Sequence, residues 1–379
     1  MKYFYIILST FVLSGCIKKS YVEFTGITPG VKNGVFVIKT VGDSTIYGEN
    51  IKDGKFTIAK QPLMVPGYYL ANITDNDNND NHQPFEIYLE NGKYSFETEK
   101  GKLYNYPKIT SPSKIQDQLS AFYILADKLT LQAKKEIDSL NSEIKAKGNS
   151  SSKIDFIASL NKLSEAKINS LQNNVTAFRE YVKQYPKSEI STHLMAKLSY
   201  EDDPVSFYEI YKTLTPAAKN TDEGKEIGNR LSHLVKLIVG AEAPPIYGKT
   251  PDGKPFDQKS IIQKIILIDF WRAGNEFSRR NHEKLNVLFS DQKNKGNFEI
   301  ISVSLDSKSD WWLTAITEDH LTWPQVSDLK GDDSPNAVNW SVTEIPTYYL
   351  LNNDWKIVER NIDIGNVAFE VSDYLKRHP

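Results

Sequence analysis

The chain has 379 residues and a formal net charge of −2, with 40% hydrophobic and 25% charged residues. This composition can bury a core, which excludes wholesale disorder, and the length predicts two or three domains at roughly 100–200 residues each. The near-neutral charge argues against an electrostatic nucleic-acid binder, because such a protein needs a basic face to displace counterions from phosphates.

Residues 1–16 have the layout of a signal peptide. Lys2 precedes an apolar run from Tyr3 to Val12, which is shorter than the roughly 20 residues that a membrane-spanning helix needs. The next four residues, Leu-Ser-Gly-Cys, end at Cys16 and resemble the lipobox of bacterial lipoproteins. The resemblance implies that Cys16 is lipidated and becomes the first residue of a mature chain held at a membrane surface. An ordinary secretory signal with an incidental cysteine is the alternative.

This leader places the chain in the cell envelope, and we expect a lipoprotein on the periplasm-facing side of the outer membrane. The residues that follow Cys16 do not themselves distinguish one membrane face from the other. The expected partners are therefore the membrane, through the lipid anchor, and an envelope protein or peptide. We expect no nucleic acid and no small-molecule cofactor.

Residues 21–112 are predicted to form a small all-β domain, a sandwich or a barrel. Apolar and polar residues alternate within Val31–Thr40 and Phe85–Thr98, and turn signals rich in Gly and Asn separate the runs. The segment Pro84–Tyr94 resembles part of the β-rich domain of unknown function that begins many thioredoxin-like lipoproteins of Bacteroidetes. The resemblance to that domain does not imply any catalytic activity.

The loop from Asp75 to Asn81 contains many oxygen ligands. Asp75, Asp77, Asn79 and Glu86 fall at positions one, three, five and twelve of a calcium loop. However, Asp80 stands where the sharp turn needs glycine, and the flanks read as strands. We predict a solvated hairpin loop and no metal site.

Residues 113–240 are predicted to be helical and to contain a long helical hairpin. Two apolar stripes at steps of three and four residues are separated by the polar run 147–152. The first stripe contains Ile115, Leu119, Phe122, Ala126, Leu129, Ala133, Ile137, Leu140 and Ile144, and the second contains Ile157, Leu160, Ile168, Leu171, Val175, Phe178 and Val182. The stripes are expected to pack on each other, and a partner-binding face is the alternative.

Residues 241–379 alternate between strand and helix, which predicts an α/β domain with a central sheet covered by helices. The predicted strands are 264–270, 298–305, 347–351 and 356–359, and the predicted helices are 275–291, 309–320 and 366–376.

Three segments of this domain resemble the thioredoxin fold in its redoxin-type branch of proteins similar to TlpA and ResA. Ile266–Trp271 looks like the strand that leads into the active site, and Ser302–Asp306 looks like the next strand. Glu344–Thr347 resembles the loop that bears the cis-proline of the fold. The resemblance implies a peptide-binding surface beside Pro346.

The cysteines of the family's Trp-Cys-x-x-Cys pattern are absent. Alignment on Trp271 places Gly274 at the tryptophan, and Asn275 and Ser278 at the two cysteines. Thiol–disulfide exchange needs a thiolate to attack and a second thiol to resolve the mixed disulfide. Since Cys16 is the one cysteine of the chain, we expect no catalytic residue here and a binding protein rather than an enzyme.

Asn275 is predicted to cap the helix that starts there, with Ser278 in its first turn. The alternative is a binding groove that holds a partner segment without chemistry. Its candidate residues are Trp271, Gly274, Asn275, Glu276, Phe277, Ser278, Ile345 and Pro346. Asp269 matches a buried aspartate of thioredoxins and should need a polar partner.

The remaining candidates are weaker. The six histidines are scattered without a metal-ligand spacing. Trp311, Trp312 and Trp323 are predicted to be packing residues. The leading hypothesis is a redox-inactive thioredoxin-like module for peptide or protein binding or scaffolding. The alternatives are a thiol–disulfide oxidoreductase, which the lost cysteines argue against, and an assembly protein that acts through the helical hairpin.

Overall fold

A computed structural model describes residues 20–78, 82–147, 153–291 and 296–378. The predicted signal peptide and Cys16 lie outside these residues. The chain divides into two compact units at Leu198 and Ser199, and each is described by itself. Among the described residues, no helix combines the length and apolar character that crossing a membrane requires.

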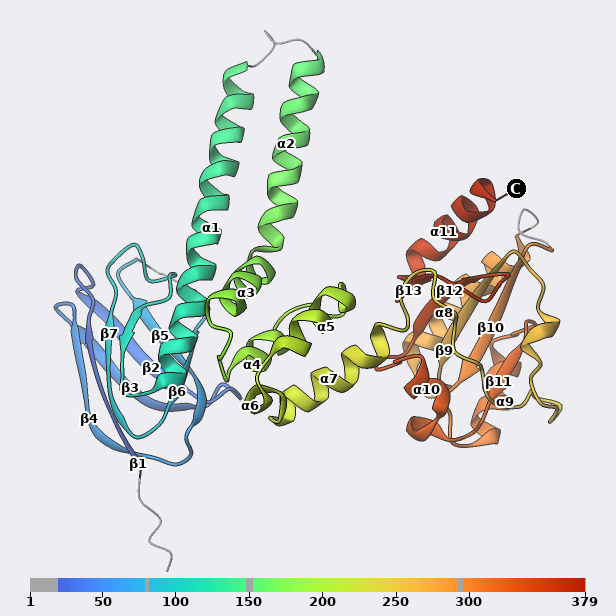
Figure 1. The fold of residues 1–379 in the computed structure, drawn as a ribbon, viewed down its shortest axis with the longest axis horizontal. Helices are drawn as coiled ribbons and strands as arrows, with labels where there is room; N and C mark the ends of the chain where they lie inside the picture. Colours follow the sequence, from blue (N-terminus) through green and yellow to red (C-terminus); the bar gives the residue numbers. More distant parts are fainter. Residues whose placement is uncertain (1–19, 79–81, 148–152, 292–295, 379) are drawn as a thin grey trace, which may run out of the picture. The chain divides into compact units, whose positions relative to one another are not determined.

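The first unit contains an eight-stranded sheet in the order β6-β5-β2-β3-β4-β1-β7-β8, in which only the β1–β7 pair is parallel. Its strands are β1 (Ser20–Ile27), β2 (Asn33–Lys39), β3 (Thr45–Lys52), β4 (Lys55–Leu63), β5 (Gly67–Asp75), β6 (Phe85–Leu89), β7 (Gly92–Glu97) and β8 (Lys108–Thr110). All eight strands contribute side chains to a single core cluster rich in phenylalanine. The sheet therefore curls around one core, as Figure 1 shows.

Helix α1 (Lys114–Lys147) starts directly after the sheet and packs against both of its terminal strands, β6 and β8. The side-chain oxygen of Gln116 accepts a 2.7 Å hydrogen bond from the amide of Tyr88, which is on the outer strand β6. Leu119 and Phe122 add buried apolar contacts. The helix therefore covers edges whose N–H and C=O groups would otherwise lack strand partners.

The predicted helical hairpin is formed by α1 and α2 (Lys153–Leu171), and it is followed by α3 (Asn173–Gln184) and α4 (Ser191–Ala196). The prediction that the second apolar stripe packs on the first is wrong for α2. Ser159, Leu163 and Ala166 are the buried residues of this helix. The stripe residues Ile157, Leu160, Ile168 and Leu171 are instead 42–84% exposed. Serine, leucine and alanine on the other side of α2 therefore face inward, and an apolar face is left at the surface.

The second unit begins with short helices and continues into a five-stranded sheet. The helices are α5 (Pro204–Thr213), α6 (Pro216–Lys219), α7 (Asp222–Leu234), α8 (Glu276–Ser290), α9 (Ser309–Glu318), α10 (Pro335–Asn339) and α11 (Ile364–Arg377). The strands are β9 (Ile265–Trp271), β10 (Phe298–Ser304), β11 (Gln325–Ser327), β12 (Thr347–Asn352) and β13 (Ile357–Arg360). The order is β11-β10-β9-β12-β13, with β9, β10 and β11 parallel and β12 and β13 antiparallel to their neighbours. All strands and helices predicted for residues 264–376 are present.

The central strand β9 is buried on both faces of this sheet. Ile265, Leu267 and Trp271 belong to the core under α8, α9 and α11. Ile266, Ile268 and Phe270 belong to the core on the opposite face. Because side chains alternate along a strand, Asp269 points to the same face as Trp271, toward α8.

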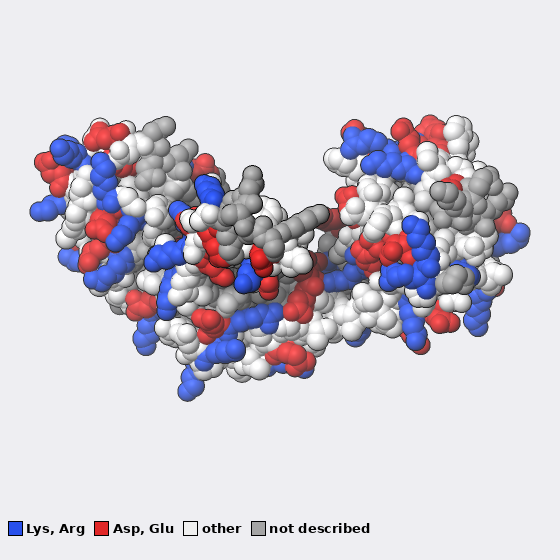
Figure 2. Space-filling view, turned by 90° about the horizontal axis from the view of Figure 1, so that it is seen from above, with Lys and Arg blue, Asp and Glu red and all other residues white. Residues whose placement is uncertain are grey.

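Positively and negatively charged side chains are mixed on the surface that Figure 2 presents. Figure 2 shows Lys and Arg side chains interspersed with Asp and Glu over the face that it presents. This distribution agrees with the net charge of −2.

Candidate functional site at the start of helix α8

Asn275 joins the start of α8 to the loop before β12. Its side-chain oxygen accepts a 2.8 Å hydrogen bond from the amide of Ser278, which makes Asn275 the N-cap that the sequence predicts. Its side-chain nitrogen donates a 3.3 Å hydrogen bond to the carbonyl oxygen of Ile345. The peptide bond between Ile345 and Pro346 is cis, as the family resemblance implies. One side chain therefore connects the two segments predicted to form the groove.

The residues that follow Asn275 differ sharply in exposure. Phe277 is 60% exposed, and the guanidinium of Arg280 lies 4.9 Å from the centre of its ring. Ser278 is fully buried, and its hydroxyl has no hydrogen-bond partner among the described residues. Glu276 and Gly274 are exposed, whereas Ile345 and Pro346 are half-buried. Phe277 is thus the large apolar side chain that this site presents to solvent.

Trp271 lies beneath the site and not at its surface. It is fully buried, and its ring meets that of His282 edge to face at 4.6 Å between centroids. A partner in the groove could not touch Trp271, which would support the groove from below.

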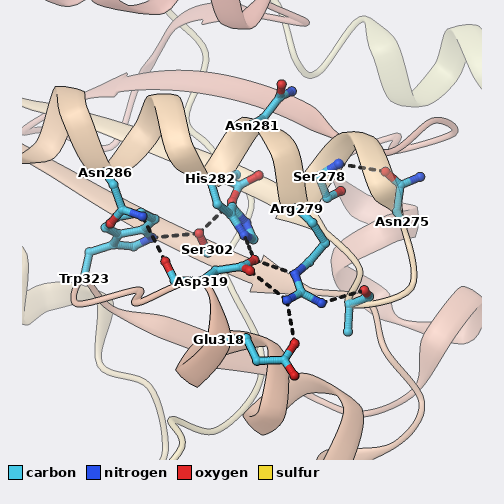
Figure 3. A network of polar contacts seen from close by, with 12 residues as sticks. Asn275, Ser278, Arg279, Asn281, His282, Asn286, Ser302, Glu318, Asp319 and Trp323 are labelled. Carbon is cyan, nitrogen blue, oxygen red and sulfur yellow. Dashed lines mark hydrogen bonds and ion pairs between the residues drawn. The ribbon is translucent and has the colours of Figure 1, made fainter.

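Asp269 and His282 form the centre of a buried polar network, which Figure 3 shows in part. One carboxylate oxygen of Asp269 accepts a 2.7 Å hydrogen bond from Ser302 and lies 3.5 Å from Nε2 of His282. The indole N–H of Trp323 donates to the same Ser302 hydroxyl at 2.9 Å. The second oxygen of Asp269 has no partner among the described residues. The partners that Asp269 needs are therefore a serine and a histidine.

A second carboxylate holds His282 from its other side. Nδ1 of His282 donates a 2.6 Å hydrogen bond to Asp319, which follows the end of α9. Arg279 clamps Asp319 with two contacts of 2.5 and 2.7 Å and also contacts Glu318 at 2.8 Å. Figure 3 shows both Arg279 and His282 reaching from α8 toward Asp319. Arg279 also donates to the carbonyl of Ala273 at 3.3 Å, so the network holds the turn that precedes Asn275.

The charges of this network set the protonation of its histidine. Burial alone would lower the pKa of His282, but the carboxylates of Asp269 and Asp319 raise it above its ordinary value. Burial would raise the pKa of Asp319, but Arg279 and His282 together lower it. The arrangement therefore favours a protonated His282 that faces an ionised Asp319.

His282 was missed as a site residue because its partners are far away in sequence. The spacing of Ser278, His282 and Leu285 does place all three on one face of α8, and all three are buried. This periodicity was the available signal, since a histidine on the buried face of a helix needs polar partners.

Other predicted candidates lie elsewhere. Trp312 and Trp323 are buried packing residues as predicted, but Trp311 is 52% exposed, which corrects its assignment to packing. Asp75 of the calcium-like loop accepts hydrogen bonds from the amide of Asp77 and the side chain of Asn78. Among the residues that the structure describes, no cluster of three or more His, Cys, Asp or Glu side chains could hold a metal ion.

The fold of the second unit and the cis-proline loop next to a capped helix define a thioredoxin-like domain. Residues 263–357 match the thioredoxin-like family profile. Asn275 and Ser278, which the alignment on Trp271 places at the two cysteines of the family pattern, lie at the start of α8 in this domain.

Similar proteins include thiol–disulfide oxidoreductases. ResA of Bacillus cereus is 28% identical over 127 residues, which cover 34% of this chain and 71% of ResA. ResA of Bacillus anthracis is 26% identical over 142 residues, which cover 38% and 79%. The solved thioredoxin domain of a Bacteroides vulgatus thiol–disulfide oxidoreductase is 29% identical, with a TM-score of 0.34, over 36% of this chain and 98% of that one. A thioredoxin-like protein from Bacteroides caccae is 16% identical, with a TM-score of 0.45, over 60% and 87%.

Proposed function

We propose that this protein is a lipid-anchored envelope protein whose thioredoxin-like domain binds an extended peptide or protein segment without redox chemistry. The observation that carries the proposal is the structural role of Asn275 and Ser278, the two residues that align with the family's cysteines. Asn275 caps α8 and holds the Ile345 carbonyl, and Ser278 is buried in the first turn. Residues 17–379 contain no cysteine, so no thiolate is present to attack a disulfide.

The surface around Phe277 supports peptide binding. Phe277 offers an exposed aromatic ring two residues after Asn275, whose side chain holds the carbonyl of Ile345 next to the half-buried Pro346. The amide N–H of Ile345 has no hydrogen-bond partner within the described part of the chain. A main-chain donor next to apolar side chains is what an extended segment needs for backbone pairing and side-chain anchoring.

Photo-crosslinking in cells tests the groove. A photo-reactive residue replaces Phe277, and a matched control replaces Phe369, which lies on α11 and is 67% exposed. Because exposure at the two positions is similar, nonspecific labelling should be equal. We expect a discrete product from position 277 alone. Equal and diffuse labelling from both positions would end the groove hypothesis.

The lipid anchor is a separate part of the proposal and has its own test. Cys16→Ala should abolish incorporation of a radiolabelled fatty acid and release the protein from the membrane fraction, because the lipid is attached through the thiol. Unchanged fractionation and labelling of the variant would rule out Cys16 as the anchor. Separation of inner and outer membranes, followed by protease accessibility, tests the expected periplasm-facing outer-membrane location.

The oxidoreductase alternative predicts measurable turnover. A catalytic amount of the wild-type protein should leave the rate of insulin reduction by dithiothreitol unchanged, because the domain has no thiol to cycle. An acceleration that Asn275→Ala or Ser278→Ala abolishes would favour the oxidoreductase and refute the proposal.

Assembly through the helical hairpin is a second candidate function, favoured by the exposed stripe on α2. Ile157, Leu160, Ile168 and Leu171 share the face of α2 that points away from its buried residues. Contiguous exposed apolar residues of this kind mark interaction sites. Sedimentation of the wild-type chain and of Leu160→Glu tests it, with Leu131→Glu, 44% exposed on α1, as the matched control. A purely monomeric wild type would remove self-assembly from consideration.

A further inference from the structure

An open hollow lies between the start of α8 and helix α9. It has a volume of about 430 Å³ and is lined by the small residues Ala273, Gly274 and Ala315 together with Trp311 and Thr314. This volume is within the range of roughly 300–1,000 Å³ that small-ligand sites occupy. Arg279, Asp310 and Glu318 complete the lining, and Gly274 directly precedes Asn275 in the chain, so the hollow lies next to the start of α8.

Gly274 leaves open space at one side of the hollow. A Cβ built on Gly274 would meet no atom within 4 Å, and the residue does not have a positive φ. Neither the space nor the backbone therefore requires glycine here. In the family pattern this position is tryptophan, so a bulky side chain is missing from the place where the hollow opens.

Trp311 supplies an aromatic wall that is accessible to solvent. It is 52% exposed, whereas its neighbour Trp312 is 3% exposed. The ammonium group of Lys308 lies 4.3 Å from the centre of the Trp311 ring. An exposed tryptophan beside an apolar hollow favours a flat apolar guest, since aromatic rings supply large contact areas.

The charges around the hollow restrict the guest further. The guanidinium of Arg279 already forms ion pairs with Asp319 and Glu318, so it is not available to a guest. Asp310, in the first turn of α9, forms no ion pair within the described residues. Asp310 lines the hollow, and the nearby Lys308 is engaged with the Trp311 ring. The Asp310 carboxylate can therefore pair with a guest that carries a cation.

We propose that the hollow is the anchor subsite for a peptide partner, and that it receives an aromatic or large aliphatic side chain that is adjacent to a Lys or Arg. The inference rests on the proposed peptide-binding function and names the chemistry of its partner. The apolar side chain packs against Trp311 and Gly274, and the neighbouring cation faces Asp310.

Defined peptides test the subsite with the full-length chain. The probe is the fluorescein-labelled hexapeptide Gly-Ser-Phe-Lys-Ser-Gly, and binding is followed by fluorescence anisotropy. The comparison peptides replace its Phe with Ala or its Lys with Glu. Gly274→Trp fills the hollow, Trp311→Ala removes its wall, and Asp310→Asn removes its charge. Gly42→Trp is the matched filling control, because Gly42 lies in an exposed turn without a positive φ and its added Cβ would meet only Thr40 Oγ1 at 3.8 Å.

The size of each expected effect follows from the interaction that the substitution removes. Gly274→Trp and Trp311→Ala should each weaken binding by about tenfold or more, since each removes the burial of an aromatic side chain. Asp310→Asn should weaken it about two- to fivefold, because an exposed ion pair contributes little, and added salt should reduce that difference. Replacement of Phe in the probe should match the effect of Gly274→Trp. Hydrogen-exchange protection of α8 and α9 in each variant verifies that the domain is folded.

The outcomes separate this inference from the proposed function. Equal binding of the probe to the wild type and Gly274→Trp would overturn the subsite and leave the groove standing. No binding of the probe to the wild type up to about 1 mM would also overturn it, while crosslinking from position 277 would still decide the groove. A third outcome is that Gly274→Trp abolishes binding of the probe but position 277 gives no discrete crosslink. This outcome would support the hollow as a subsite and rule out the groove beside Pro346.

Discussion

Each compact unit buries one network of ionised side chains, and the two networks are built differently. In the first unit the central group is the carboxylate of Glu86, 8% exposed, on the outer strand β6. Lys197 approaches it at 2.7 Å, His193 at 3.3 Å and the hydroxyl of Tyr123 at 3.0 Å. In the second unit the central group is His282, held between two carboxylates. One network surrounds the carboxylate of Glu86 with a lysine, a histidine and a tyrosine, and the other places a titratable histidine between two aspartates.

This difference determines the pH at which each unit depends on its network. Burial would raise the pKa of Glu86, but His193 and Lys197 lower it, so its charge persists throughout the neutral range. The pKa of His282 is raised, so its charge is lost on the alkaline side of its ordinary value of 6.5. The first network should therefore fail as the pH falls below 4.5, and the second should weaken as the pH rises above 6.5.

The largest effect is expected from removal of the second network's centre. His282→Ala leaves Asp269 without a cation in a fully buried position, which should lower the free energy of unfolding of the second unit by about 3 kcal/mol. Hydrogen exchange measured by mass spectrometry reports on β9 and β10 separately from the first unit. The control His233→Ala, at a partly exposed position, should change stability by less than about 0.5 kcal/mol. Unchanged protection of β9 would show that Asp269 and Ser302 suffice without the histidine.

A smaller loss is expected at the centre of the first network. Glu86→Gln removes the charge that Lys197 and His193 face but keeps a polar group, which should cost about 2 kcal/mol. The protection of β5 and β6 against hydrogen exchange measures it. Glu49→Gln, at an exposed position, is the matched control. If Glu86→Gln and Glu49→Gln behave alike, the first network contributes no more than a surface pair, and the contrast between the two units disappears.

The pH dependence distinguishes the two networks directly. Because the folded pKa of His282 lies above its unfolded value, its contribution is complete below pH 6.5 and is lost as the pH rises through the folded pKa. Denaturant titrations of the second unit from pH 6 to about pH 9 should show this loss, with a slope of at most about 1.4 kcal/mol per pH unit. His282→Asn should abolish the slope. The folded pKa of Glu86 is lowered, so its contribution is present above pH 4.5 and is lost as the pH falls below it.

The smallest effect is expected at the edge of the second network, at the helix cap. Asn275→Ala should destabilise the second unit by about 1 kcal/mol, the usual loss for an N-cap. Asn275→Asp keeps the cap acceptor but loses the donor to Ile345. It should therefore be close to the wild type in stability and altered in the cis-proline loop, as followed by amide chemical shifts. A loss in Asn275→Asp as large as in Asn275→Ala would assign the stability to the Ile345 contact.

Local sequence patterns were sufficient to predict much of the fold. The strands and helices of residues 264–376 follow from periodicity, and the cap at Asn275 follows from residue type and position. Two short elements, β11 and α10, were missed, because three to five residues give too little periodicity to detect.

Contacts between residues that are distant in sequence could not be predicted from these local patterns. Glu86 and His193 are separated by 107 positions, and His282 and Asp319 by 37. Nothing in the spacing of either pair indicates that they meet. The exposed face of α2 was missed for a related reason, since an apolar stripe predicts burial without saying which residues a neighbouring helix covers. Trp311 and Trp312 are adjacent in sequence, but consecutive positions of a helix point in directions about 100° apart, so one is buried and the other is not.

Helix α1 has a consequence for dissection of the first unit. Because it lies against both β6 and β8, a fragment that stops at residue 112 would present two bare strand edges at once. Such edges template pairing with further chains. The β-rich segment should therefore aggregate when expressed alone and stay soluble when α1 is retained. The continuation of the chain past β8 therefore serves as the cover of both outer strands of this sheet.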